Sequence, residues 1–211
     1  MLQLKALRAA FLVLFLLLLG TVSLSCEDKP DALKLFSDGK YDDARRACLA
    51  AIAADPSDVD SYVIVSWSLV AMGRYADAEN YALKGYTLRR DPRLTEVLGE
   101  TAFFLGRNDA ALRNFQNYVG ALPEGERVGT AYYYMGELYL RLGRFGHADI
   151  ALSTALQFSP GSAKWWTRLG YARERYGDLS HSLAAYRQAL SLDPRLEDAS
   201  AGVARVTDKL R

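Results

Sequence analysis

The sequence is poor in the side chains that build covalent and metal cross-links, with only two cysteines and two histidines. Cys48 falls on a helix face that we expect to be packed, so a disulfide with Cys26 is not expected. His147 and His181 lie one repeat period apart, which separates them by roughly 10 Å at ordinary helix spacing. A histidine nitrogen that binds zinc lies about 2.1 Å from the ion, so two histidines this far apart cannot bind the same ion. The sequence predicts a fold held by its apolar core, with no metal and no cofactor.

The chain also lacks an excess of either charge and the motifs of common enzymes. Its 26 basic and 25 acidic residues nearly cancel, and they are interspersed along the sequence. Nucleic-acid binding needs concentrated positive charge, so a nucleic-acid partner is not expected. We find no phosphate-binding glycine loop, no dinucleotide-binding glycine cluster and no recognisable group of nucleophile, base and orienting residue. We therefore expect a protein that is not an enzyme.

Long apolar runs are absent except at the start of the chain. A basic beginning precedes an apolar run at residues 9–19, which is shorter than the roughly 20 residues of a membrane-spanning helix. Residues 1–25 therefore have the pattern of an export signal. Ser23 and Ser25 then lead to Cys26 in a segment that resembles the lipobox of bacterial lipoproteins, although that family prefers leucine at the place of Ser23. The resemblance implies that Cys26 becomes a lipidated N-terminus.

We accordingly expect an exported protein that is anchored in a bacterial membrane through Cys26 and faces the periplasm. The pattern does not choose between the inner and the outer membrane. Two alternatives stay open, because the same segment is compatible with ordinary secretion after cleavage and with a signal anchor that remains in the membrane.

Five glycines recur at an almost constant spacing through the rest of the chain. They are separated by 34, 33, 37 and 34 residues, and an alanine or serine follows each one five places later: Gly39, Gly73, Gly106, Gly143 and Gly177. A fixed period between 20 and 50 residues indicates stacked supersecondary units. Because glycine leaves a helix through positive φ without steric cost, each is expected in the turn between two helices.

The fourth unit shows the two predicted helices most clearly. Gly136 shares a face with apolar residues before Gly143, and Ala148 belongs to a second apolar face that ends before Pro160. The small residues Gly136 and Ala148 let the two backbones approach closely. Neither helix buries its apolar face alone, so neighbouring units must stack.

These positions resemble the tetratricopeptide repeat, whose pattern is W-x-x-L-G-x-x-Y, then A-x-x-x-F, then P over 34 residues. The fifth unit matches it at Gly170, Tyr186 and Pro194, for example. The resemblance implies an all-α, right-handed superhelical solenoid of about five helix-turn-helix units in one domain, residues 27–211. The expected units are 27–58 with a shortened first helix, 59–91, 92–128 with extra loop residues, 129–162 and 163–196, and a capping helix at 197–210.

The resemblance also implies a concave groove, because the first helix of each unit faces it in this family. The predicted groove is aromatic in its middle and basic at one end, and its partner-binding residues are Trp67, Glu96, Glu100, Phe103, Tyr133, Tyr134, Glu137, Lys164, Arg168, Tyr171 and Arg175. Aromatic and arginine side chains often dominate binding energy at interfaces. The groove is therefore the expected place of contact with a partner.

Lys164 and Arg168 resemble the last pair of a carboxylate clamp, with which some members of the family grip the C-terminus of a chaperone. Glu96, Glu100 and Tyr134 stand where such a clamp needs lysine or asparagine, so a clamp is not expected. We expect instead a non-enzymatic scaffold or assembly factor that binds a segment of another envelope protein. A carrier for a small apolar ligand and a structural homo-oligomer are the alternatives.

Overall fold

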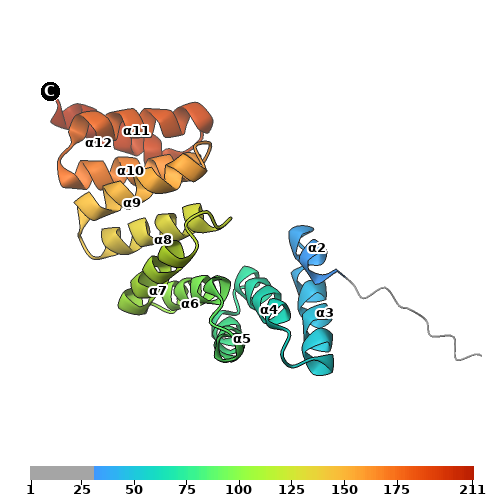
Figure 1. The fold of residues 1–211 in the computed structure, drawn as a ribbon. Helices are drawn as coiled ribbons and strands as arrows, with labels where there is room; N and C mark the ends of the chain where they lie inside the picture. The colour runs from blue at the N-terminus through green and yellow to red at the C-terminus, as the bar shows by residue number, and fades with distance from the viewer. Residues whose placement is uncertain (1–30) are drawn as a thin grey trace, which may run out of the picture. The chain divides into compact units, whose positions relative to one another are not determined.

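The computed structural model describes residues 31–211, so the predicted signal segment and Cys26 lie outside the described residues. Within this range the chain is all-α and contains no strand, as Figure 1 shows. No helix among the described residues is long and apolar enough to cross a bilayer. The predicted fold class, an α-helical solenoid, is confirmed.

The helices form successive pairs joined by short turns, and one further helix follows the last pair (Figure 1). The pairs are α2 (Ala32–Ser37) with α3 (Tyr41–Ala54), α4 (Val59–Ala71) with α5 (Tyr75–Leu88), α6 (Pro92–Phe104) with α7 (Asn108–Ala121), α8 (Val128–Arg141) with α9 (Phe145–Phe158), and α10 (Ala163–Tyr176) with α11 (Leu179–Leu192), and the final helix is α12 (Glu197–Lys209).

The turn inside each pair contains one of the five periodic glycines. Their φ angles lie between 69° and 95°, and no other residue in the described range has a positive φ. A Cβ atom added at any of them would meet no atom within 4 Å. The backbone conformation, and not crowding, therefore requires glycine here, which confirms the expected turn.

A second kind of glycine lets the two helices of a pair approach closely. A Cβ at Gly136 in α8 would lie 2.6 Å from Cγ of Leu152 in α9. Ala148, also in α9, is fully buried. In the second unit Ser66 takes the equivalent place, and its buried hydroxyl donates a hydrogen bond to the Tyr62 carbonyl at 2.7 Å. The predicted close contact between paired helices is confirmed.

The even-numbered helices form the inner layer of the stack. Each of them contacts the next even-numbered helix, whereas every odd-numbered helix contacts only its neighbours in sequence. The first helices of successive units therefore lie close together, and the second helices are spread apart on the outer side. This arrangement brings α4, α6, α8 and α10 together on the side where the groove is predicted.

Two departures from strict periodicity affect the site. Residues 122–127 join α7 to α8 and form a longer connection than residues 89–91 or 159–162, which join the neighbouring pairs. We call residues 122–127 the inserted loop. At the C-terminal end, α12 packs Ala199 and Val206 against Tyr186 of α11 and so covers the last unit. Residues 193–196 lead into this helix and reach the inner layer.

Candidate partner-binding groove

Helices α6, α8 and α10, together with the start of α12, enclose a groove of about 650 Å³. Its walls combine aromatic rings with both signs of charge and are formed by Phe103, Phe104, Tyr133, Tyr134, Glu137, Lys164, Thr167, Arg168, Arg195, Leu196, Glu197 and Asp198. A cavity of this size, part apolar and part polar, suits a ligand segment of several residues. We call it the central groove.

The predicted binding residues do not all lie in one hollow. Tyr133, Tyr134, Glu137, Lys164 and Arg168 line the central groove. A second hollow of about 420 Å³, the cap cavity, lies beside α12 and is lined in part by Tyr171 and Arg175. A third of about 230 Å³, the loop cavity, lies against the inserted loop and is lined in part by Trp67 and Glu96. Phe103 also lines the central groove, whereas Glu100 lines none of the three hollows.

Three of the predicted partner-binding residues are almost fully covered by neighbouring side chains. Glu96 is 0% exposed, Glu100 is 5% exposed and Phe103 is 7% exposed. The Arg141 guanidinium covers the Phe103 ring at 3.8 Å from its centroid. Side chains from the next unit account for this burial, because they reach back over α6.

Arg127 of the inserted loop is the centre of the buried cluster. Its Nε lies 2.8 Å from Oε1 of Glu96, and its Nη2 lies 2.7 Å from Oε2 of Glu100. The Trp67 indole donates to Glu96 Oε2 at 3.3 Å, and the Tyr134 hydroxyl donates to Glu100 Oε1 at 3.1 Å. Two carboxylates of α6 therefore share one arginine, and the cluster joins α4, α6 and α8.

The protonation of this cluster follows from burial and from that sharing. Complete burial raises the pKa of Glu96 to about 7, because Arg127 only partly opposes the effect and Glu100 adds to it. Burial alone would lower the pKa of Arg127, but the negative charges of Glu96 and Glu100 outweigh burial and hold that pKa above its usual value. Arg127 therefore stays charged while Glu96 can change its charge near neutral pH.

The aromatic part of the groove has two packed rings, Phe103 and Tyr134, and two open ones. Tyr134 lies 4.7 Å from Phe103 and 5.5 Å from Phe115 between ring centroids, so it belongs to the core. Tyr133 stacks on Trp165 at 5.0 Å and keeps one side in the groove. Phe104 stacks on Tyr75 at 4.3 Å and is 42% exposed. Tyr133 and Phe104 are the rings that a ligand can reach.

The basic end of the groove is weaker than the sequence predicts. Arg168 donates two hydrogen bonds to Glu137, at 2.6 and 2.9 Å, and is therefore neutralised from the neighbouring helix. Arg175 donates to the Tyr171 hydroxyl at 3.0 Å and lies over the Phe145 ring. In the described part of the chain Lys164 makes no ion pair, and its Nζ lies 6.0 Å from the Tyr133 ring centroid. Lys164 is the cation of α10 that a ligand can use in the central groove.

Sequence reasoning missed the residues that come from outside the first helices. One wall of the central groove is formed by Arg195, Leu196, Glu197 and Asp198. The sequence places the first two at the end of the fifth unit and the other two in a capping helix. Arg127 was counted as part of a loop insertion. The longer spacing before Gly143 was the available signal for that insertion, but spacing does not tell which way a loop side chain points.

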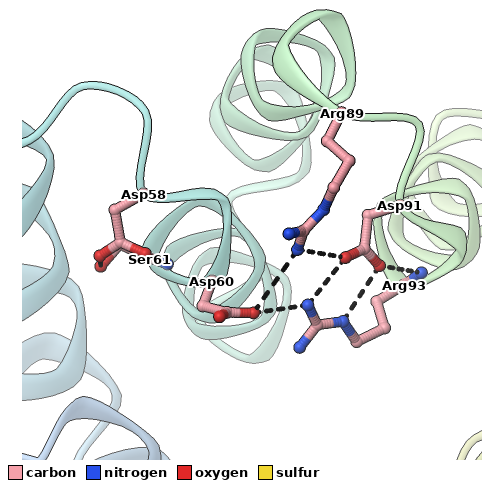
Figure 2. Close-up of polar contacts among 6 residues, drawn as sticks. All are labelled: Asp58, Asp60, Ser61, Arg89, Asp91 and Arg93. Atoms are coloured by element: carbon pink, nitrogen blue, oxygen red, sulfur yellow. Dashed lines mark hydrogen bonds and ion pairs between the residues drawn. The ribbon is translucent and has the colours of Figure 1, made fainter.

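A second charged cluster joins α4 to α6 beside the loop cavity, and Figure 2 shows it. Arg93 bonds the Asp91 carboxylate at 2.7 Å and the Asp60 carboxylate of α4 at 2.5 Å. Arg89 also bonds Asp91, at 2.9 Å. The hydrogen bond from the Arg93 side chain is the main reason that the pKa of Asp91 falls to about 2. Asp91 and Pro92 also start α6, so this cluster fixes where that helix begins.

No group of three or more metal-binding side chains is found among residues 31–211. The His147 ring lies against the Tyr139 ring, and His181 contacts Asp178, the residue that precedes its own helix. Both histidines thus have local partners.

The family model described as tetratricopeptide repeat matches residues 30–94, 96–163 and 163–196. The chain belongs to the tetratricopeptide repeat family. The period, the turn glycines and the inner layer of first helices are features of these repeats. The family provides scaffolds suited to protein–protein interaction, and nothing in the comparisons indicates catalysis.

Two curated relatives match parts of the chain. The Hsp70-Hsp90 organizing protein of Triticum aestivum is 29% identical over 106 residues, which cover 50% of this chain and 18% of that protein. The general transcriptional corepressor ssn6 of Schizosaccharomyces pombe is 27% identical over 135 residues, which cover 61% of this chain and 12% of that protein. The chain thus spans less than a fifth of the length of these relatives.

Solved structures resemble the whole array. MamA from Desulfovibrio magneticus RS-1 superposes with a TM-score of 0.64 at 19% identity, covering 79% of this chain and 93% of that one. YrrB, described as a tetratricopeptide repeat protein with an unusual peptide-binding site, superposes with a TM-score of 0.63 at 19% identity, covering 81% and 87%. At these identities the likeness establishes the fold alone.

Proposed function

We propose that this chain is a lipid-anchored scaffold or assembly factor of the bacterial envelope that holds a segment of another envelope protein in the central groove. The observation that supports this best is the groove itself, where the open rings of Tyr133 and Phe104 lie beside the unpaired Lys164. Open aromatic rings supply binding energy at little entropic cost, because they are already held in place by stacking.

The peptide-binding description of YrrB and the chaperone-organising name of the wheat protein are consistent with a groove that binds protein segments. The partner differs from that of a carboxylate clamp, because Glu96 and Glu100 replace the cations of such a clamp. In the central groove the partner has an apolar or aromatic side chain for Tyr133 and Phe104 and an acidic group for Lys164.

The envelope location rests on the sequence of residues 1–26, with its basic start, apolar run and small residues before Cys26. The lipid on Cys26 holds the repeat array at a membrane surface, so the partner is a protein that is embedded in or assembled at that membrane. Residues 27–31 separate Cys26 from α2, the first described helix, which begins at Ala32. Fully extended, they span no more than about 18 Å.

The groove can be tested by placing a photo-crosslinking amino acid at position 133 in the full chain and irradiating membranes of the native host. We expect a specific adduct from position 133 and none from position 176, since Tyr176 is 66% exposed and lies outside the central groove. Once the partner is identified, combining Tyr133→Ala with Lys164→Ala should weaken its binding by about tenfold or more. Unchanged binding with retained helical circular dichroism would contradict the groove assignment.

The anchor has its own test, which is intact mass spectrometry of the mature protein. We expect a diacylglycerol-modified Cys26 at the N-terminus, and we expect Cys26→Ser to move the protein out of the membrane fraction. An unmodified Cys26 would refute the lipid anchor while leaving the groove proposal in place.

A further inference from the structure

The loop cavity is a separate hollow whose walls are more acidic than those of the central groove. It has a volume of about 230 Å³ and is bounded by α4, α6, the end of α7 and the inserted loop. Its lining comprises Trp67, Arg93, Glu96, Tyr118, Leu122, Glu124, Gly125, Glu126 and Arg127. The repeats on either side have shorter connections at the corresponding place, so the inserted loop creates this hollow.

Both arginines that line the loop cavity are already matched by more than one carboxylate. Arg93 contacts Asp60 and Asp91, as Figure 2 shows, at 2.5 and 2.7 Å. Arg127 contacts two further carboxylates, those of Glu96 and Glu100. Neither arginine therefore contributes net positive charge to the hollow.

The lining carries more carboxylate groups than its two arginines neutralise. Glu124 and Glu126 on the inserted loop are exposed and form no ion pair within the described range. At the floor, Glu96 is fully buried, and its Oε1 faces Arg127 Nε at 2.8 Å without an aligned hydrogen bond. The cavity thus has an excess of acidic groups both at its loop edge and at its buried floor.

The remaining walls suit the body of a cationic side chain. Trp67 and Tyr118 are aromatic and Leu122 is apolar. An indole face attracts ammonium and guanidinium groups, and the Arg127 guanidinium already lies 5.9 Å from the Trp67 ring centroid. A methylene chain can therefore lie against the apolar wall while its charged end faces the carboxylates.

We propose that the loop cavity is a second binding site that takes a lysine or arginine side chain of the partner segment. Charge complementarity decides the occupant: an anionic group would face unpaired carboxylates, and a purely apolar group would leave them without a counter-ion. The proposal rests on the scaffold function. It adds that the bound segment is basic at the end near α4, whereas Lys164 accepts its acidic end near α10.

A small probe tests the cavity without knowledge of the partner. The full chain, labelled with ¹⁵N and kept in detergent micelles, is titrated with N-acetyl-arginine amide while the indole N–H resonance of Trp67 is followed. Trp67→Phe assigns this resonance. We expect a saturable shift with the arginine probe, and no saturable shift with N-acetyl-glutamine amide at equal concentrations.

A matched pair of double variants locates the site. Replacing both Glu124 and Glu126 by glutamine should weaken binding of the arginine probe by about fivefold, as expected for two partly screened charge contacts. The control replaces both Asp109 and Asp208 by asparagine, which removes the same charge at two exposed carboxylates that line neither the loop cavity nor the central groove. The control should leave probe binding unchanged. Both acidic pairs are on the surface, so both double variants are expected to fold.

The proposal that the loop cavity binds a cationic side chain would be overturned by either of two results. One is a Trp67 shift with the glutamine probe as large as with the arginine probe; the other is unchanged binding of the arginine probe when Glu124 and Glu126 are replaced. Either result is distinguishable from failure of the scaffold function, which is tested by crosslinking at position 133. If the crosslink forms and the arginine probe does not bind, the groove assignment stands and the loop cavity has no such role.

Discussion

Glu96 of α6 and Glu174 of α10 are both buried carboxylates on the inner layer of helices, yet their pKa values move in opposite directions. The pKa of Glu96 rises to about 7, and the pKa of Glu174 falls to about 2. Burial raises the pKa of both groups. The difference must therefore come from their partners.

Both carboxylate oxygens of Glu174 accept hydrogen bonds from charged side chains. The Arg205 side chain donates to both of its oxygens, at 3.2 and 3.0 Å, and Lys209 donates at 2.8 Å. The Tyr186 hydroxyl adds a bond at 3.0 Å. Two cations thus serve one carboxylate, whereas Arg127 alone serves both Glu96 and Glu100. The number of cations per carboxylate decides whether each glutamate is more stable in its charged or its protonated form.

The two clusters also have different places in the array. Glu174 holds the capping helix α12 against the fifth unit, whose apolar face α12 covers. Glu96 lies between units, next to the loop cavity. A strong ion pair stabilises the contact between the capping helix and the last unit. A carboxylate beside a cavity that its neighbouring cation does not fully neutralise can attract a cationic ligand. The comparison separates a structural acid from a candidate binding acid.

The largest expected effect comes from removing the single cation of the Glu96 cluster. Arg127→Ala should lower the free energy of unfolding by about 3 kcal/mol at pH 8, because it leaves two buried carboxylates without a counter-ion. Urea denaturation followed by circular dichroism measures this change. Arg144→Ala is the control, since Arg144 is exposed and forms no ion pair within residues 31–211, and it should cost less than about 0.5 kcal/mol. A loss below about 1 kcal/mol for Arg127→Ala would mean that the Glu96 cluster is not charged as described.

Glu174→Gln should cost about 2 kcal/mol at pH 7, a figure reduced for screening because Arg205 and Lys209 are about half exposed. Since folding lowers the pKa of Glu174, its stabilisation is complete above about pH 4.5 and is lost as the pH falls toward 2. The difference between the wild-type protein and the variant should therefore shrink between pH 5 and pH 2.5. Denaturation at several pH values measures it, and a difference that is constant over this range would contradict the Glu174 assignment.

Glu96→Gln should have an effect of comparable size, with the opposite dependence on pH. Folding raises the pKa of Glu96, so the contribution of this group to stability is complete below about pH 4.5 and is lost as the pH rises through 7. Relative to the wild-type protein, the variant should gain about 2 kcal/mol between pH 5 and pH 8. The same denaturation series, compared with Glu174→Gln, measures it. A parallel pH dependence for the two variants would remove the distinction between the two glutamates.

The smallest effect is expected at the surface end of the cluster in Figure 2. Asp60→Asn removes one of two carboxylates from Arg93 and should cost about 0.5 kcal/mol, since the Asp60 side chain is 64% exposed. High salt should reduce this cost further. Denaturation with and without 1 M sodium chloride measures both. A cost above about 2 kcal/mol would show that the α4–α6 junction depends on this exposed charge.

Much of the fold was predictable because repeats impose local requirements that are visible in the chain. The turn at Gly143 needs a positive φ, and the contact at Gly136 leaves no room for a Cβ beside Leu152. Such requirements involve residues within one unit, so the spacing alone reveals them. The candidate site was less predictable, because its exposure depends on side chains that arrive from other units.

Several residues show which features of the candidate site could not be predicted from the sequence. Glu96, Glu100 and Phe103 occupy positions that face a groove in this family, but Arg127 and Arg141 cover them from 27 to 38 residues away. Arg168 is predicted to contact a partner, and in the structure it is bound by Glu137 of the preceding unit. Lys164 and Tyr133 line the central groove, and Trp165 stacks on one side of the Tyr133 ring.

The sequence by itself determined the helical pairs, their turns and the close packing within each pair, since φ angles and backbone approach depend on the residue that occupies each repeated position. Only the tertiary structure decided which inner side chains stay open and which carboxylates share a cation. The physical reason is that burial and pKa depend on distances between units, and these distances are set by the inserted loop and the capping helix, which the repeat pattern does not encode.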